Sequence, residues 1–257
     1  MASPGQPIES IMRVAPDWAE VSLIHVNEIN VDALAVRASG NLSRLYALKV
    51  AFDGREVLAR ERAGVKLVPD YCPERHVNAG GTFCLGLNAG RGISDASAPA
   101  WWVKLKSFLL CQDTASETGI WPDYAQMSHG DAGDIEAKAE QLAQSIGRLG
   151  DFHRAVRSDD GPIAACLDKV RTTGQLRNGR SACLCGRKDA KGRSILRREC
   201  HKLGCPIELE FARRRETRRF WDAARGQPCC RSMKNCPLDD RAALVPDKRP
   251  SLNTVDL

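Results

Sequence analysis

One cysteine in the N-terminal half lies in a segment whose residue types suit nucleophilic chemistry. Cys84 follows Gly80 and Gly81, whose small size allows another chain to approach the sulfur closely. His76 and Asn78 precede it by no more than eight residues and could supply polar groups. A cysteine near a histidine is a common nucleophile arrangement, because the thiolate is the reactive form. The alternative is an inert, packed side chain.

A second group of cysteines has the spacing of zinc ligands. Cys183 and Cys185 are separated by one residue and followed by a glycine, and Cys200, His201 and Cys205 come next. Two thiolates on one tight turn and a second pair further along could close a tetrahedron around the ion. The pattern resembles SEC-C-type zinc motifs with a longer gap. It predicts a structural zinc site, with His201 or Cys205 as the fourth ligand.

A third group, Cys229, Cys230 and Cys236, provides three more thiols. They could form a second zinc site with Cys166 or Cys205, or serve the first site across the fold. Cys72 and Cys111 are isolated in sequence, and we expect both to be packed thiols.

Five arginines crowd residues 213–219, within a predicted helix over 208–225. Such a cluster can bind phosphate groups, so we expect an acidic protein surface or nucleic acid as a partner. The alternative is a solvated helix face whose arginines pair with Glu208, Glu210 and Glu216.

The elements that would position these residues begin with strands and continue with helices. Apolar segments predict strands at 21–26, 45–52 and 65–68, and Asp53-Gly54 predicts a hairpin that returns through 55–58. Apolar residues at helical spacing predict helices over 98–112 and 133–149. Strands followed by helices indicate an α+β fold.

Charge and cysteine content divide the chain in two. Residues 1–160 contain 16 Lys and Arg against 21 Asp and Glu, whereas residues 161–237 contain 19 against 7. Eight of the 11 cysteines follow residue 160, and 157–162 resembles a linker. We therefore predict a first domain over 1–155, a basic zinc-binding domain over 160–240 and a loose tail over 241–257.

Several classes of protein are excluded by what the sequence lacks. No apolar run is long enough to span a membrane, and the N-terminus has no secretion signal, so we expect a cytoplasmic protein without a membrane partner. Clustered cysteines in a reducing compartment are more often metal ligands or catalytic thiols than disulfides. No phosphate-binding loop is present, so we expect no ATP to be bound by this chain.

The order of features resembles the ubiquitin-conjugating enzymes. In that family a strand meander leads to a flap with His-Pro-Asn and then to a glycine, one residue, an apolar residue, the catalytic cysteine and leucine. Residues 81–85, Gly-Thr-Phe-Cys-Leu, match this last part, and Trp101 and Trp102 begin the helix expected after it. Trp121-Pro122 and His129-Gly130 resemble the prokaryotic branch. The resemblance covers roughly residues 15–150 and implies a ubiquitin-conjugating fold followed by a zinc-stabilised domain.

The resemblance also implies a mechanism and partners. Cys84 would accept a ubiquitin-like protein from an activating enzyme as a thioester and pass it to a target amine, in a bacterial conjugation pathway linked to antiviral defence. Glu74, Arg75 and His76 occupy the His-Pro-Asn positions, so His76 or Asn78 would support the oxyanion. His129 and Asp131 are candidates for accepting the amine proton; their alternatives are a surface histidine and a helix N-cap.

Other functions remain open at the level of sequence. The chain could be a zinc protein that binds nucleic acid without catalysis, although base-reading motifs are lacking. It could be an inactive adaptor with the conjugating fold, although adaptors lack the cysteine. A cysteine protease needs a distant histidine in a pattern that is not specific here.

Overall fold

A computed structural model describes residues 6–37, 39–167, 182–184, 186, 188–196, 205–234 and 236–239. The chain forms two compact units, one containing the described residues up to Ala125 together with those from Gly226 onward, and the other containing those from Gln126 to Arg225. Each unit is described by itself.

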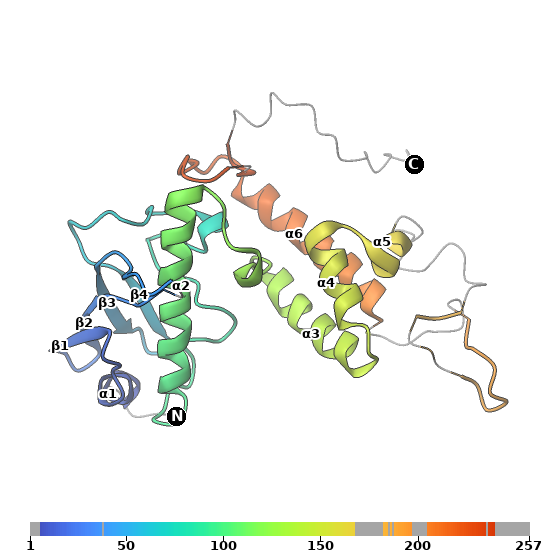
Figure 1. The fold of residues 1–257 in the computed structure, drawn as a ribbon, viewed down its shortest axis with the longest axis horizontal. Coiled ribbons are helices and arrows are strands. Elements are labelled where there is room, and N and C mark those ends of the chain that lie inside the picture. The colour runs from blue at the N-terminus through green and yellow to red at the C-terminus, as the bar shows by residue number, and fades with distance from the viewer. Residues whose placement is uncertain are drawn as a thin grey trace. The chain divides into compact units, whose positions relative to one another are not determined.

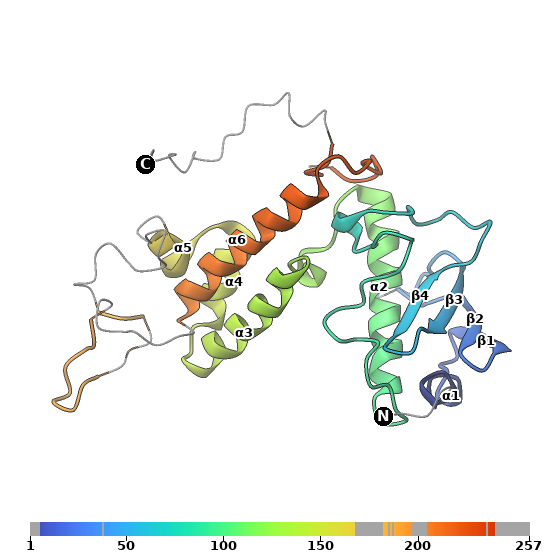
Figure 2. The same cartoon turned by 180° about the vertical axis from the view of Figure 1, so that it is seen from behind.

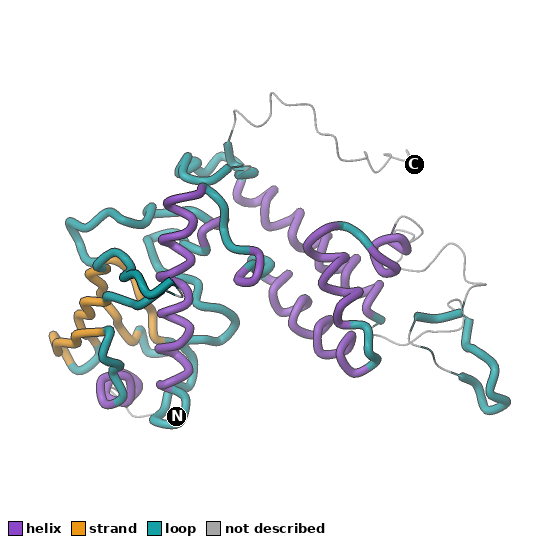
Figure 3. Tube along the Cα trace, in the orientation of Figure 1, coloured by secondary structure: helices purple, strands orange, loops and turns teal. Residues whose placement is uncertain are grey.

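The first unit is built on a four-stranded antiparallel meander (Figures 1 and 3). Its strands are β1 (Ala19–His25), β2 (Glu28–Ala33), β3 (Tyr46–Phe52) and β4 (Val57–Glu61), paired in chain order. Side chains in β2 and β3 alternate between buried and partly exposed positions, as expected for a sheet with one face covered. The α+β fold class is thereby confirmed.

The β3–β4 hairpin forms where the sequence predicts it. The Asp53 carboxylate accepts hydrogen bonds from the backbone N–H groups of Arg55 (2.8 Å) and Glu56 (2.9 Å), while Gly54 takes a positive φ of 97°. The strand predicted over 65–68 is wrong. The Glu61 carboxylate instead accepts hydrogen bonds from the N–H groups of Leu67 and Val68, and these two residues form a bend that pairs with no strand.

Two helices and a short helical turn complete the first unit's regular structure before residue 119. These are α1 (Gln6–Arg13), the 3₁₀ turn η1 (Pro73–Arg75) and α2 (Ala98–Thr118). Trp101, Leu105 and Leu109 of α2 are buried, and the Tyr46 hydroxyl of β3 donates to Asp113 of α2 at 2.7 Å. The predicted helix over 98–112 therefore exists and continues for six further residues. A second 3₁₀ turn, η2 (Asp123–Ala125), follows.

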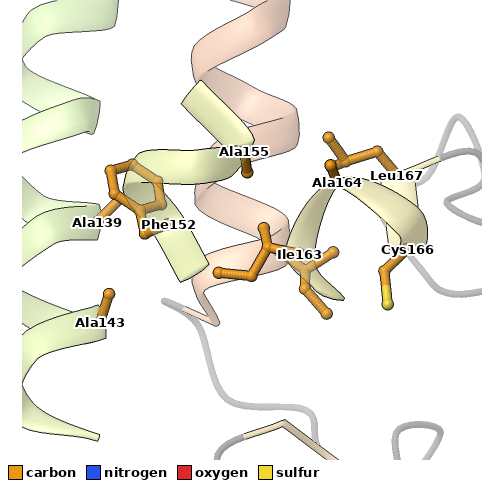
Figure 4. Packing of buried hydrophobic residues seen from close by; sticks show 9 residues of the cluster. Ala139, Ala143, Phe152, Ala155, Ile163, Ala164, Cys166 and Leu167 are labelled. Carbon is orange, nitrogen blue, oxygen red and sulfur yellow. The ribbon is translucent and has the colours of Figure 1, made fainter. Parts of the chain in front are cut away.

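The second unit is helical in its described part. It contains α3 (Asp131–Ser145), α4 (Leu149–Ser158), α5 (Gly161–Leu167) and α6 (Pro206–Ala224). Figures 1 and 2 show α3 and α6 running alongside each other. Phe152 of α4 lies against small residues of α3, including Ala139, and Ile163 of α5 extends the same core (Figure 4).

The boundary between the units differs from the predicted division after residue 155. The expected turn at 157–162 is present, because α4 ends at Ser158 and α5 begins at Gly161. However, α4 and α5 pack with α3 and α6 on one apolar core, so the turn lies inside a unit. The predicted helix over 133–149 is likewise two helices, separated at Gly147, which has a φ of 66°. The predicted tail over 241–257 lies outside the described residues.

Candidate active site and thiol cluster

Cys84 lies in a loop that backbone hydrogen bonds connect both to the segment at His76 and to β4. Its backbone N–H donates to the His76 carbonyl at 2.8 Å, and the N–H of Phe83 donates to the Ala59 carbonyl of β4 at 2.8 Å. The Phe83 ring is buried and stacks on Phe108 of α2, with centroids 4.6 Å apart. Cys84 itself is partly exposed. A fixed backbone with an accessible side chain is what a nucleophile requires.

His76 and Asn78 belong to the same loop but have different environments. His76 adopts the left-handed backbone conformation, with φ 53°, and its buried ring lies 5.1 Å from that of Trp121. Asn78 is exposed and its amide donates to the Thr82 hydroxyl at 3.5 Å. The structure thus brings the backbone of His76 directly beside that of Cys84, and leaves Asn78 exposed where the turn that closes on Thr82 begins.

Glu74 and Arg75, which occupy the His and Pro positions of the His-Pro-Asn motif, do not have the roles of that motif. Arg75 is 2% exposed; its guanidinium donates to the side chain and carbonyl of Gln112, while Gln112 donates back to the Arg75 carbonyl at 2.7 Å. Arg75 therefore fastens the loop to α2. Burial raises the pKa of Glu74 to about 7.

His129 and Asp131 belong to the second unit, so their role beside Cys84 stays a prediction. The His129 ring stacks on Phe220 at 5.0 Å and meets Trp221 edge-on at 5.3 Å. Burial lowers the pKa of His129 to about 4, which keeps it neutral at pH 7. Asp131 is the exposed first residue of α3, and Gly130 is the N-cap.

The C-terminal cysteines fall within the first unit. Cys229, Cys230 and Cys236 lie beside Cys72, and the sulfurs of Cys72 and Cys230 are 3.0 Å apart. Cys72 is buried as expected, but it contacts a thiol rather than only apolar groups. Sequence spacing could not reveal this, since 158 residues separate the pair. Cys111 is also buried, with its sulfur 3.6 Å from the Tyr124 hydroxyl.

The predicted zinc ligands of the second unit are only partly described. Cys185, Cys200 and His201 lie outside the described residues. Cys183 is buried, and Cys205 precedes α6 and packs against the helical core that contains Cys166. Within the described part of the chain, no three His, Cys, Asp or Glu side chains are arranged around a position that could hold a metal ion.

Four of the five clustered arginines form ion pairs within the second unit. Arg213 and Arg214 both bind Glu210, whose side chain is fully buried, and Arg214 also binds Asp159 at 2.6 Å. Arg215 and Arg219 bind Glu216. The alternative of arginines paired with glutamates is thus largely what forms. Arg213 and Arg214 hold α6 in place, and only the exposed members remain for an acidic partner.

Comparisons with known families also divide the chain near residue 125, but the second match continues beyond Arg225 into the segment that belongs to the first unit. Residues 19–123 match the family described as the prokaryotic E2 domain, and residues 128–238 match a cysteine-rich domain found C-terminal to E2 domains. Neither the search of curated proteins nor the search of solved structures gave a match. No helix of the described residues is long and apolar enough to cross a membrane.

Proposed function

We propose that the chain has a ubiquitin-conjugating-like role and that Cys84 is its thioester-forming nucleophile. The match of residues 19–123 to the prokaryotic E2 domain and of residues 128–238 to the cysteine-rich domain that follows E2 domains supports this role. The observation that carries this proposal is the partly exposed Cys84 on a backbone hydrogen-bonded to His76 and braced by Phe83. The partners would be an activating enzyme, a ubiquitin-like protein and a target amine. The resemblance to the prokaryotic branch of the ubiquitin-conjugating enzymes suggests antiviral defence as the setting.

The proposed reaction has two acyl-transfer steps. The Cys84 thiolate attacks the thioester carbonyl of the charged activating enzyme, forming a new C–S bond and releasing that enzyme's thiol. A target amine then attacks the Cys84 thioester, forms an amide bond and releases the Cys84 thiolate, while the amine's proton passes to a base. Asp131 and His129 are the proposed bases, and the exposed carboxylate is the more accessible of the two.

Both steps pass through a tetrahedral oxyanion that needs hydrogen-bond donors. His76 occupies the family's asparagine position and shares a backbone hydrogen bond with Cys84, so we assign it the supporting role ahead of Asn78. Loss of a single oxyanion donor typically costs about 100-fold or more in rate.

The proposal is tested by charging the purified chain with its activating enzyme, the ubiquitin-like protein and ATP, followed by a non-reducing gel. We expect a band that reductant removes, that Cys84→Ala abolishes and that becomes reductant-stable in Cys84→Ser. Cys111→Ala is the matched control, because Cys111 is a buried thiol of the same unit and should leave charging unchanged. A charged activating enzyme that gives no adduct on this chain would refute the proposal.

We also propose that the Cys183, Cys185, Cys200, His201 and Cys205 region of the second unit binds structural zinc. Support comes from the ligand spacing in the sequence and from the match to a cysteine-rich domain. Total metal analysis of the full chain tests it, with Cys185→Ser expected to lower the zinc content.

A further inference from the structure

Two thiols of the first unit meet from chain segments that are far apart in sequence. Cys72 precedes η1 and Cys230 lies in the segment after α6, yet their sulfurs are 3.0 Å apart. The sulfurs of a disulfide bond are about 2.05 Å apart, so a movement of about 1 Å would join the pair. Cys229 and Cys236 lie close by, and we call the four residues the thiol cluster.

The two thiols in contact differ in their access to solvent. Cys72 is 1% exposed, whereas Cys230 is partly exposed. A dissolved oxidant therefore meets Cys230 first, and the Cys72 sulfur is already in contact with the atom that reacts. An accessible attacking thiol beside a second, resolving thiol is typical of cysteine pairs that respond to oxidants.

Hydrogen-bond donors and a positive charge surround the Cys230 sulfur. The Ser232 hydroxyl lies 3.1 Å from it, and the Ser232 backbone N–H donates to it. The Arg75 guanidinium, which is almost fully buried, donates to the Ser232 hydroxyl at 3.3 Å and attracts negative charge on Cys230. Donors and a cation stabilise a thiolate, which is the form of cysteine that attacks an oxidant.

We propose that Cys230 and Cys72 are a peroxide-reactive pair, in which oxidation of Cys230 by hydrogen peroxide leads to a disulfide with Cys72. The Cys230 thiolate attacks one peroxide oxygen, so that an S–O bond forms, the O–O bond breaks and hydroxide leaves. The hydroxide takes up the proton that Cys230 lost. The Cys72 sulfur then attacks the sulfenic sulfur, an S–S bond forms, and the S–O bond breaks as water leaves with the Cys72 proton. Two thiols are oxidised and one peroxide is reduced to two waters.

The disulfide would tie the C-terminal segment to the loop that contains His76. The backbones of Cys72 and Val77 exchange two hydrogen bonds, at 2.9 and 3.0 Å, so Cys72 lies at the base of that loop. The segment is already placed there without a covalent link, because the Lys234 amide donates to the Gly119 carbonyl at 2.7 Å. Oxidation therefore adds a covalent bond to an existing contact. In the reducing compartment that the sequence leads us to expect, such a bond is transient.

The test is peptide mapping of the full chain after treatment with equimolar hydrogen peroxide. The remaining thiols are alkylated under denaturing conditions, and the chain is digested with trypsin without reductant. Trypsin places Cys72 in the peptide 67–75, Cys229 and Cys230 in 226–231, and Cys236 in 235–241. We expect 67–75 and 226–231 to appear as one linked species that reductant splits. A native chain in which these two peptides stay unlinked would overturn the proposal.

Cys111 is the matched control for a buried thiol of the same unit. Its sulfur lies 3.6 Å from the Tyr124 hydroxyl, and it falls in a separate tryptic peptide, 107–138. We expect this peptide to be recovered alkylated and unlinked, with or without peroxide. Linkage of 107–138 to the same extent as 67–75 would mean unspecific oxidation and would overturn the proposal.

Single substitutions decide which sulfur bonds to Cys72 and which is oxidised first. The link should be retained in Cys229→Ser and lost in Cys230→Ser. In Cys72→Ser the sulfenic acid has no resolving thiol, so dimedone should label 226–231, and fragment spectra should place the label on Cys230. A link that survives in Cys230→Ser, or a dimedone label on Cys229 instead, would overturn the proposal. None of these measurements involves thioester formation, so their outcome is separate from the role of Cys84.

Discussion

At the scale of single residues, His76 is the position where this chain departs from the ubiquitin-conjugating enzymes that it resembles, and it offers a sharp test of the proposed mechanism. Its left-handed backbone conformation suits asparagine better than most residues, and asparagine is the residue that the resemblance leads one to expect there. We expect His76→Asn to retain transfer from Cys84 to lysine, and His76→Ala to slow it about 100-fold. Single-turnover discharge of preformed thioester measures this.

Loading of Cys84 provides the internal control for that comparison. The His76→Ala chain should still accept the ubiquitin-like protein, since the backbone carbonyl that binds the Cys84 amide is unchanged. Asn78→Ala should have a smaller effect on discharge, because its exposed amide already binds Thr82. Equal discharge rates in native and His76→Ala chains would remove His76 from the mechanism.

The residues of the candidate active-site loop could be predicted because they are close in sequence, whereas the contact between Cys72 and Cys230 could not. Residues 81–85 carry a local motif, and the hydrogen bond from Cys84 to His76 spans only eight positions. Cys72 meets Cys230 only because the chain returns to the first unit after α6. The spacing of residues in the sequence shows which side chains can lie on one local turn. It does not show that a distant segment comes back to the same unit.

At the scale of elements, the sheet and α2 are joined by a buried carboxylate. Asp113 of α2 is 1% exposed and binds Arg37, Arg44 and Tyr46, all of which lie in or near β3 or the loop before it. Burial alone would raise the pKa of Asp113, but hydrogen bonds from Arg44, Tyr46 and Arg37 outweigh it and hold the pKa below its usual value.

The lowered pKa of Asp113 predicts a stability contribution that depends on pH. Because the folded state favours the charged form, the contribution is present above pH 4 or so and is lost as the pH falls through the folded-state value. Asp113→Asn should cost about 3 kcal/mol at pH 7, and the difference from the native chain should shrink in acid. Urea unfolding followed by tryptophan fluorescence measures it, since four of the five tryptophans lie in the first unit.

An exposed aspartate serves as the control for this pH dependence. Asp70 pairs with Lys66, and both side chains are more than three-quarters exposed. Asp70→Asn should therefore change the free energy of unfolding by less than about 1 kcal/mol. A similar loss in both variants, or no narrowing of the Asp113→Asn difference in acid, would contradict the assignment.

Strands and helices that bury one clear apolar face could be predicted from the sequence. Elements whose limits are set by packing against neighbouring elements could not. β3 and α2 show clear periodicity in the sequence, whereas polar residues within and beside β2 obscure the alternation of Ile29, Val31 and Ala33. The apolar spacing continues from α3 into α4, so the sequence pattern does not indicate the break at Gly147.

At the scale of the whole molecule, the basic character of the C-terminal half has a structural component. Glu210 is fully buried and receives hydrogen bonds from Arg213 at 2.6 and 2.8 Å. Arg213→Ala should therefore destabilise the second unit by about 3 kcal/mol, since it weakens the compensation of a buried charge. Arg218→Ala removes an exposed arginine and should have little effect. Thermal unfolding followed by circular dichroism distinguishes them, and equal stabilities would show that the Arg213–Glu210 pair is dispensable.

The return of the chain to the first unit predicts how the molecule can be divided. The Lys234 amide donates to the Gly119 carbonyl at 2.7 Å, Ser232 binds Arg75, and Met233, Cys236 and Leu238 are buried. A chain of residues 1–125 alone would expose the surface that these side chains cover and lose Cys229, Cys230 and Cys236. Joining 1–125 to 226–257 through a flexible Gly/Ser linker should restore a cooperatively folded unit that accepts the thioester, whereas 1–125 alone should unfold at a lower temperature. If the two chains melted at the same temperature, the C-terminal segment would be an appendage rather than part of the E2 domain's core.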